Sequence, residues 1–184
     1  MGTLRYLCDY EAASKLGSGA CGDVFKGYYK TDGSLVAVKK FKNGISEREK
    51  EILKSISHEN IVSIIEVIEK RKMIIMEYCD LGSMLDHIYK PRHRYGMEER
   101  SFFDFLSQFS DGLQFLIEKR VVHRDIKPGN IMRCGNSNGS VTYKITDFGL
   151  SKVLSNPEES MTSAVGTRVY AHPKILNRVR IYVF

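Results

Sequence analysis

The spacing of apolar residues changes once along the chain, and this change limits the possible fold more than any other feature. Before residue 79, apolar residues come in short runs typical of β-strands. These runs are residues 16–17, 24–29, 35–41, 61–68 and 73–78. From about Glu98 to Lys119 they recur at helical spacing. We therefore expect a strand-rich part followed by a helix-rich part, joined at residues 79–83.

Local signals add a turn and a helix to the strand-rich part. Residues 31–34, TDGS, favour a hairpin turn. Ser46 with Glu49 three residues later is typical of a capping box, and Ile52, Leu53 and Ile56 would form the apolar face of this helix. The longer second helix has an apolar face that indicates core packing, made of Phe102, Phe105, Leu106, Phe109, Leu113 and Leu116.

Composition indicates one globular domain, because 184 residues with 42% hydrophobic side chains can bury a sizeable core. No apolar run reaches the roughly 18 residues of a membrane span, and the N-terminus does not resemble a secretory signal, so we expect a cytoplasmic protein without a membrane partner. The net charge of +6 is not gathered into one patch, which argues against nucleic acid. The cysteines are widely spaced, which argues against a disulfide framework or zinc.

A glycine-rich segment, LGSGACGDV, occupies residues 16–24. Glycines allow the backbone to fold over a phosphate and to present N–H groups to its oxygens. Dinucleotide-binding folds use a similar pattern, but there the segment opens a helix and an acidic residue follows. Here it leads into a strand, and the next chemically distinctive residue is Lys39, in VAVK. Buried among apolar neighbours, this cation would need an anion, and Glu49 is the expected one.

Two polar segments in the second half carry the remaining chemistry. VVHRDIKPGNIM, residues 121–132, holds Asp125, Lys127 and Asn130 between apolar pairs. KITDFG, residues 144–149, places Asp147 after an apolar strand, 22 residues beyond Asp125. A carboxylate and an amide oxygen, together with substrate phosphates, suit a hard cation such as Mg²⁺. We therefore expect Asn130 and Asp147 to hold magnesium.

In this order, GxGxxGxV, VAVK, HRDIKPGN and DFG resemble the protein-kinase signature set, from about Tyr10 to about Leu176. Three further segments are most similar to the IκB-kinase-related branch that contains TANK-binding kinase: MEYCDLGSM, ITDFGLSK and GTRVYAHP. The resemblance implies an α+β fold of two lobes. It implies a five-stranded antiparallel N-lobe with one helix at about 10–78, a hinge at about 77–82, and an incomplete, mainly helical C-lobe at about 83–184.

The resemblance also implies a task for each motif in transfer of the ATP γ-phosphate with Mg²⁺. Lys39 would hold the α and β phosphates and Glu49 would fix Lys39. Asp125 would accept the proton of the substrate hydroxyl, and Lys127 would balance charge on the transferred group. The loop over the phosphates would be Leu16, Gly17, Ser18, Gly19, Ala20, Cys21 and Gly22, and the adenine site would be Val24, Ala37, Met132, the backbone of Glu77 and Cys79, and Met76 at the rear.

The spacing of Lys127 after Asp125 is the serine/threonine pattern, so a protein Ser/Thr hydroxyl is the expected acceptor. Arg124 beside Asp125 implies a regulatory phosphate on the loop after DFG. Ser163 matches the family's position for it, with Thr162 as a competitor and an upstream activating kinase as a partner.

Two departures from the family pattern leave two functions open. Lys39 and Glu49 are only ten residues apart, which implies a shortened helix. After AHPKIL the chain runs NRVRIYVF, with Lys174 where an acidic residue is expected, so the resemblance implies a C-terminally truncated lobe. Phe102, Phe109 and Leu116 would then lack partners. The chain would be a Ser/Thr kinase, or a truncated fragment that binds nucleotide or a partner without efficient turnover.

Overall fold

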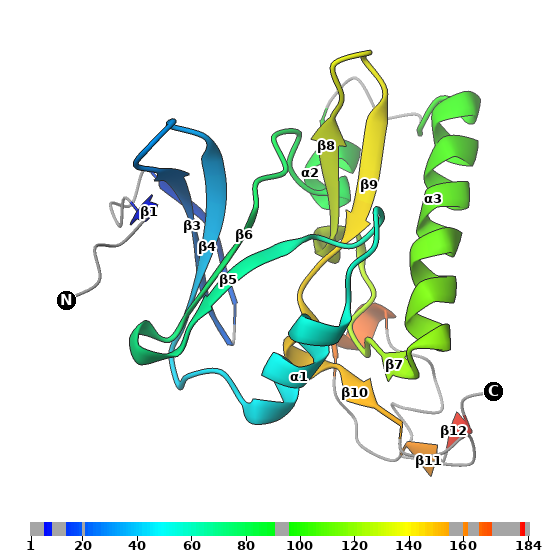
Figure 1. Ribbon diagram of the computed structural model, residues 1–184. Coiled ribbons are helices and arrows are strands. Elements are labelled where there is room, and N and C mark those ends of the chain that lie inside the picture. The colour runs from blue at the N-terminus through cyan, green and yellow to red at the C-terminus, as the bar shows by residue number, and fades with distance from the viewer. Residues whose placement is uncertain are drawn as a thin grey trace.

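The structure, a computed structural model, describes residues 6–8, 14–19, 21–90, 96–154, 160–161, 166–170 and 181–182. A sheet with one helix forms one side of the molecule, and a long helix with a β-hairpin forms the other (Figure 1). Residues 78–83, called the connecting segment below, follow the last strand of the sheet. None of the helices among these residues is long and apolar enough to cross a membrane.

The sheet has six antiparallel strands in the order β1-β3-β4-β6-β5, with β2 also paired to β3. The strands are β1 (Tyr6–Cys8), β2 (Lys15–Ser18), β3 (Gly22–Tyr29), β4 (Leu35–Phe41), β5 (Ile64–Ile68) and β6 (Met73–Glu77). The five predicted strands are confirmed, although the fourth begins at Ile64 rather than Ile61. The additional strand, β1, pairs with residues 27–29 of β3.

Alternation along the central strands gives the sheet two buried faces. Val36 and Val38 of β4 pack on one face with Met73 and Ile75 of β6. Ala37 points to the other face. The predicted turn at residues 31–34 closes the β3–β4 hairpin through hydrogen bonds between Tyr29 and residues 33 and 34.

The helix α1 (Glu47–Ser55) follows β4 and begins as its sequence predicts. The Ser46 hydroxyl accepts a hydrogen bond from the backbone N–H of Glu49 at 3.1 Å, which caps the helix. The predicted apolar face of Ile52, Leu53 and Ile56 is buried. It belongs to a core cluster that spans both sides of the molecule and also contains Phe41, Ile61, Ile74, Leu116, Val121, Ile145 and Phe148.

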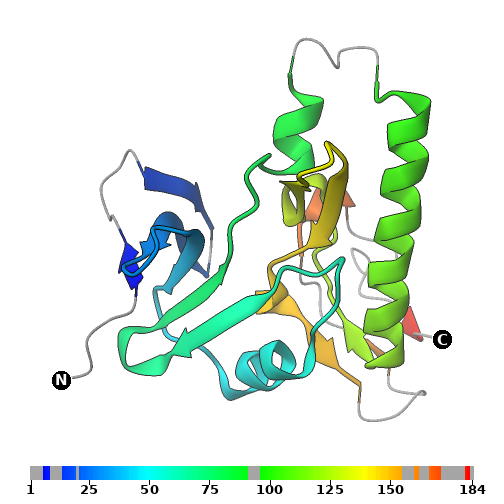
Figure 2. The ribbon, with the colours of Figure 1, turned by 45° about the horizontal axis from the view of Figure 1, so that its top comes forward.

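The helix α3 (Glu99–Glu118) lies on the far side of the molecule from β1 to β4 in both views (Figures 1 and 2). Gly112 lets it approach residues 58–62, because a Cβ there would lie 3.1 Å from the backbone oxygen of Asn60. The Asn60 amide bridges Gln108 of α3 and the backbone oxygen of Tyr143 at 3.1 and 3.0 Å. Polar and close apolar contacts together therefore fix this helix.

The expectation that Phe102, Phe109 and Leu116 lack partners is wrong. Leu116 is only 2% exposed, because α3 packs on the cluster that contains Ile61 and Ile145. Phe109 stacks on Phe105 with ring centroids 5.5 Å apart. Phe102 is 44% exposed, but its ring contacts those of Phe103 and Phe105, with centroids 5.9 and 6.5 Å apart.

The remaining elements build the region between the sheet and α3. The short helix α2 (Met84–Ile88) is capped by Ser83 and Asp86 in a reciprocal capping box. β8 (Ile131–Gly135) and β9 (Val141–Ile145) form a hairpin between the connecting segment and α3 (Figure 2). Two short pairs join β7 (Val121–Val122) with β10 (Lys152–Val153) and β11 (Ser160–Met161) with β12 (Ile181–Tyr182). Single 3-10 turns cover Glu69–Arg71, Pro128–Asn130, Phe148–Leu150 and Arg168–Tyr170.

Candidate active site

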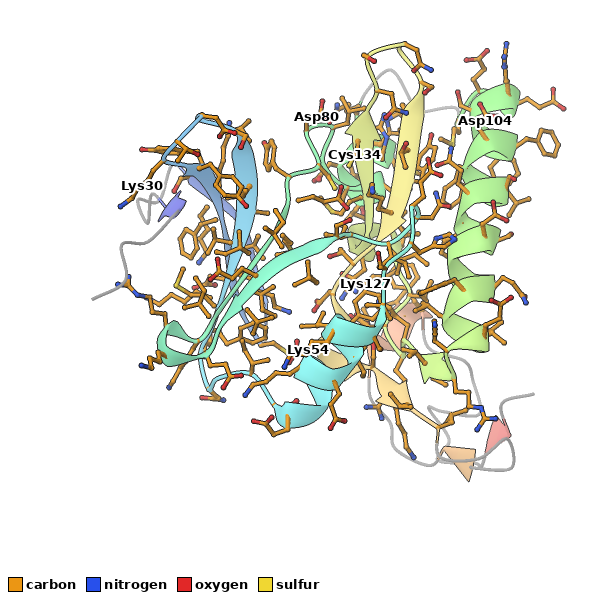
Figure 3. All side chains as sticks on the ribbon, viewed as in Figure 1. Lys30, Lys54, Asp80, Asp104, Lys127 and Cys134 are labelled. Atoms are coloured by element: carbon orange, nitrogen blue, oxygen red, sulfur yellow. The ribbon has the colours of Figure 1, made fainter. Side chains whose placement is uncertain are left out.

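Three separate parts of the chain bring the predicted polar residues together. Lys39 comes from β4, residues 125–130 lie between β7 and β8, and Asp147 follows β9. Figure 3 shows Lys127 near the centre of the molecule. Among the described residues, two open cavities of about 410 and 320 Å³ lie elsewhere and none of these polar residues lines them. The site is therefore defined by its side-chain contacts.

The Asp125 carboxylate is held by three neighbours. Lys127 Nζ lies 2.8 Å from Asp125 Oδ2, and Asn130 Nδ2 donates to the same oxygen at 3.0 Å. On the other side, the backbone N–H and the hydroxyl of Thr167 donate to Asp125 Oδ1 at 2.8 and 2.7 Å. Burial alone would raise the pKa of Asp125, but the hydrogen bonds from Lys127 and Thr167 outweigh it and lower the pKa below its ordinary value. The group is a fixed carboxylate at neutral pH.

Thr167 is a site residue that the sequence argument missed. Its hydroxyl accepts a hydrogen bond from Lys127 Nζ at 2.7 Å while it donates to Asp125, so it links the two. Gly166 has φ +110°, and a Cβ there would overlap the backbone oxygen of Arg124. The close approach of this segment thus requires glycine. The available signal was the Gly-Thr pair in GTRVYAHP.

His123 supports Asp125 from inside the protein. Its Nε2–H donates to the backbone oxygen of Thr146 at 2.8 Å, which leaves Nδ1 to accept the backbone N–H of Asp125 at 3.3 Å. Burial lowers the pKa of His123, so the ring is neutral and fits these two roles. The ring also meets Phe148 edge to face, with centroids 5.0 Å apart.

Lys39 pairs with Asp147 at 2.8 Å rather than with Glu49, which corrects the predicted ion pair. Among the ion pairs of the described residues, none joins Lys39 to Glu49. The physical reason is the short connection: Glu49 sits in the first turn of α1, with its N–H tied to Ser46. Burial would raise the pKa of Asp147, but the adjacent Lys39 outweighs it and lowers the pKa.

Glu49 nevertheless lies near the pair. Burial raises its pKa, the charge of Lys39 opposes this rise, and the charge of Asp147 adds to it. A Cβ at Gly149 would lie 3.6 Å from Glu49 Oε1 and 3.3 Å from Cys21 Sγ. The glycine-rich segment, α1 and the DFG segment therefore converge at one point.

The side chains of Asn130 and Asp147 suit a hard cation. Both amide hydrogen bonds of Asn130 go to Asp125, to its backbone oxygen at 2.8 Å and to its carboxylate, which leaves the amide oxygen available. Asp147 is half-exposed and has φ +67°. The described residues contain no cluster of three or more His, Cys, Asp or Glu side chains that could hold a metal. Two protein oxygens are a usual Mg²⁺ set when substrate phosphates supply others.

The glycine-rich segment forms the end of the β2–β3 hairpin. The backbone N–H of Gly19 donates to the oxygen of Gly22 at 2.8 Å. A Cβ at Gly22 would overlap the backbone of Lys40 in the neighbouring strand, so that position requires glycine. Leu16, Gly17 and Ser18 are exposed, and Ala20 lies outside the described residues.

The predicted adenine residues form one apolar cluster at the connecting segment. Ala37, Met76 and Cys79 are buried there with Val62, and Val24 and Met132 pack against them. The backbone N–H of Cys79 has no acceptor among the described residues. Glu77 anchors the segment, because its carboxylate pairs with Lys144 at 3.0 Å. An apolar surface with a free backbone donor at its edge suits a planar base.

The structure describes Arg124 but not the predicted phosphorylation residues. Arg124 has φ +66°, and its Nε donates to the backbone oxygen of Leu150 at 2.5 Å. Ser163 and Thr162 lie outside the described residues, as does Lys174. The regulatory site therefore stays a prediction.

A family model described as a protein kinase domain matches residues 10–182. The chain belongs to the protein kinase family. The mouse (Mus musculus) inhibitor of nuclear factor kappa-B kinase subunit epsilon is 38% identical over 96% of the chain and 26% of that protein. The alpha subunit from chicken (Gallus gallus) is 32% identical over 90% of the chain and 24% of that protein.

A third kinase, cyclin-dependent kinase-like 2 from rabbit (Oryctolagus cuniculus), is 33% identical over 91% of the chain and 30% of that protein. The chain is thus related to the IκB kinases among the protein kinases, and it spans about a quarter of the length of the curated IκB-kinase relatives it matches. The expected kinase-like fold is confirmed.

Proposed function

We propose that the chain is a cytoplasmic serine/threonine protein kinase that transfers the γ-phosphate of ATP to a protein hydroxyl. The observation that carries the proposal is the cluster of Asp125, Lys127, Asn130 and Thr167, which holds a carboxylate acceptor and a cation side by side. The alternative of a fragment without efficient turnover is not favoured, because the catalytic groups are already in contact. We assign residues 10–78 to the N-lobe, 77–82 to the hinge and 83–184 to part of the C-lobe.

Asp125 positions the substrate hydroxyl and takes its proton. The hydroxyl oxygen then forms a bond to the γ-phosphorus, the bond from that phosphorus to the bridging oxygen breaks, and ADP leaves. Lys127 faces the same reaction space and balances the negative charge of the transferred group. Thr167 holds Asp125 and Lys127 at their spacing, so neither has to reorganise.

Lys39 is the cation for the α and β phosphates, and the glycine-rich segment supplies backbone N–H groups to them. Asn130 and Asp147 would hold Mg²⁺, which supplies charge neutralisation between phosphates when bound. Asp147 forms an ion pair with Lys39 in this structure. In the complex with nucleotide, Lys39 would bind the phosphates and Asp147 would bind the cation. Cys79 and Glu77 would read the adenine edge through their backbones, with Met76 behind.

Ser163 is the proposed regulatory phosphorylation site, modified by an upstream kinase. Arg124 supports this assignment, because it lies beside Asp125 and contacts the segment that follows DFG through Leu150. A phosphate paired to this arginine would fix the loop relative to the catalytic carboxylate.

The experiment is phosphate transfer from labelled ATP with Mg²⁺ to generic Ser/Thr and Tyr peptides. We expect labelling of Ser/Thr peptides only, and its loss in Asp125→Ala with nucleotide binding retained. Transfer by Asp125→Ala at the wild-type rate would refute the role of this carboxylate. Labelling of tyrosine alone would refute the acceptor class.

A further inference from the structure

Two cysteines meet where the connecting segment lies against β8. Backbone hydrogen bonds hold the two segments together, from Leu81 N–H to the oxygen of Arg133 at 3.1 Å and from Arg133 N–H to the oxygen of Gly82 at 2.9 Å. Asp80 Oδ1 accepts the N–H of Gly135 at 2.8 Å. Asp80 and Cys134 lie close to this junction (Figure 3). This pairing brings Cys79 and Cys134 to the same place from positions 55 residues apart.

The two thiols lie in the same apolar cluster. Cys79 is buried beside Met76, and Cys134 packs against these residues. Cys79 is 6% exposed, whereas Cys134 is half-buried and reachable from solvent. The hydrogen bond with Cys134, together with burial, raises the pKa of Cys79, and the same bond lowers the pKa of Cys134. Cys134 is therefore the better nucleophile of the pair.

Neither thiol has a role in phosphate transfer. The proposed nucleotide contact of Cys79 uses its backbone N–H, and the thiol of Cys134, on β8 two residues beyond Met132, has no proposed contact with the nucleotide. We propose that Cys79 and Cys134 form a reversible disulfide when a peroxide oxidises the protein. The pair is a modification site that ties the connecting segment covalently to β8.

The reaction balances with hydrogen peroxide as the oxidant. The Cys134 sulfur attacks one peroxide oxygen, the O–O bond breaks, and a sulfenic acid and water form once the leaving hydroxide takes the thiol proton. The Cys79 sulfur then attacks the sulfenic sulfur, the S–S bond forms, the S–O bond breaks, and the hydroxide leaves as a second water with the proton of the Cys79 thiol. The two thiols lose two electrons and two protons, and the peroxide is reduced to two waters.

The disulfide would weaken nucleotide binding, a consequence that rests on the proposed function. A disulfide needs the two Cβ atoms about 3.8 Å apart in a defined torsion, so its formation would change the position of Cys79 relative to β8. The N–H of Cys79 moves with it and no longer meets the adenine edge. Loss of one such hydrogen bond corresponds to about tenfold weaker binding, or ~1.4 kcal/mol.

The first experiment maps the bond and does not depend on kinase activity. Reduced wild-type protein is treated with hydrogen peroxide, digested without reductant and analysed by mass spectrometry. We expect a peptide pair that joins Cys79 to Cys134 and disappears with dithiothreitol. A disulfide to Cys8 or Cys21 instead, or only oxygen adducts at Cys134, would overturn the proposal.

The second experiment measures the affinity for an ATP analogue before and after oxidation. We expect about a tenfold loss in wild type, reversed by dithiothreitol, and no loss in Cys134→Val or Cys134→Ala, which cannot form the bond. Equal losses in wild type and both variants would refute the link to this pair. If reduced wild type binds no nucleotide at all, the proposed function fails, while the peptide map still decides the disulfide.

Discussion

Lys39 Nζ lies 2.8 Å from Asp147 Oδ1, although the two residues are 108 positions apart. The contact joins β4 of the sheet to the segment that follows β9. Lys39 is nearly buried and Asp147 is half-exposed, so solvent screens the ion pair only from the side of Asp147. This ion pair and the apolar cluster that contains Phe41 and Ile145 both connect the sheet to the other side of the molecule.

Asp147→Asn should remove this ion pair and the proposed cation ligand together. We expect the free energy of unfolding to fall by about 1 kcal/mol, since one partner is half-exposed, and phosphate transfer to be lost. Urea unfolding and labelled-ATP transfer measure the two effects. Asp104→Asn, on the exposed side of α3, is the matched control and should leave both unchanged. Full activity in Asp147→Asn would contradict the assignment.

Thr167→Ala should impair catalysis more than binding. It removes a hydroxyl that donates to Asp125 and accepts from Lys127, so kcat should fall about 10- to 100-fold. The affinity for nucleotide should stay near that of wild type. Thr167→Ser keeps the hydroxyl and should retain most activity. Equal loss in the two variants would mean that the hydroxyl is not the group that matters.

Glu49→Gln should change how stability depends on pH. Burial raises the pKa of Glu49 above its unfolded value of 4.5, so the contribution of this group is complete below that value and is lost as pH rises through the folded pKa. The variant lacks this loss of stability. Its free energy of unfolding should therefore equal that of wild type in acid and exceed it at neutral pH. Thermal unfolding across this range gives the comparison. A variant less stable than wild type at neutral pH would indicate that ionised Glu49 pairs with Lys39.

His123 should make the protein less stable in mild acid. Burial lowers its pKa below the unfolded value of 6.5, so the unfolded chain binds more protons between the two pKa values. Stability is complete above 6.5 and declines as pH falls toward the folded pKa. Denaturant unfolding at several pH values should show this slope in wild type and a flatter one in His123→Asn. Identical slopes would show that His123 is not the titrating group.

Sequence patterns predicted the elements whose stability is local. β4 has the bounds expected, because the apolar run within 35–41 predicts a strand and the TDGS turn sets its register with β3. The cap at Ser46 and the helix near 98–119 follow from spacing alone. The strand β1 was missed because three residues are too few to show a period.

Contacts between distant segments were harder to predict. The motif order placed Asp125, Lys127 and Asn130 in one loop, and the structure brings them together. The partner of Lys39 depends on where α1 begins relative to β9, which no local pattern encodes. Thr167 was missed for the same reason, since its 42-residue separation from Asp125 is closed only by the backbone approach at Gly166.

The backbone bonds of β8 and β9 also limit how the sheet can move against α3. Residues 60–62 are tied to Ile145 of β9, and residues 81–82 are tied to Arg133 of β8, so both ends of the β5–β6 hairpin are anchored. Between these anchors, the N–H of Glu77 donates to the oxygen of Ser63 at 3.0 Å, which joins the two ends of the hairpin to each other. A turn of the sheet against α3 would therefore have to bend the chain at these two anchors, beside the residues proposed to read the adenine edge.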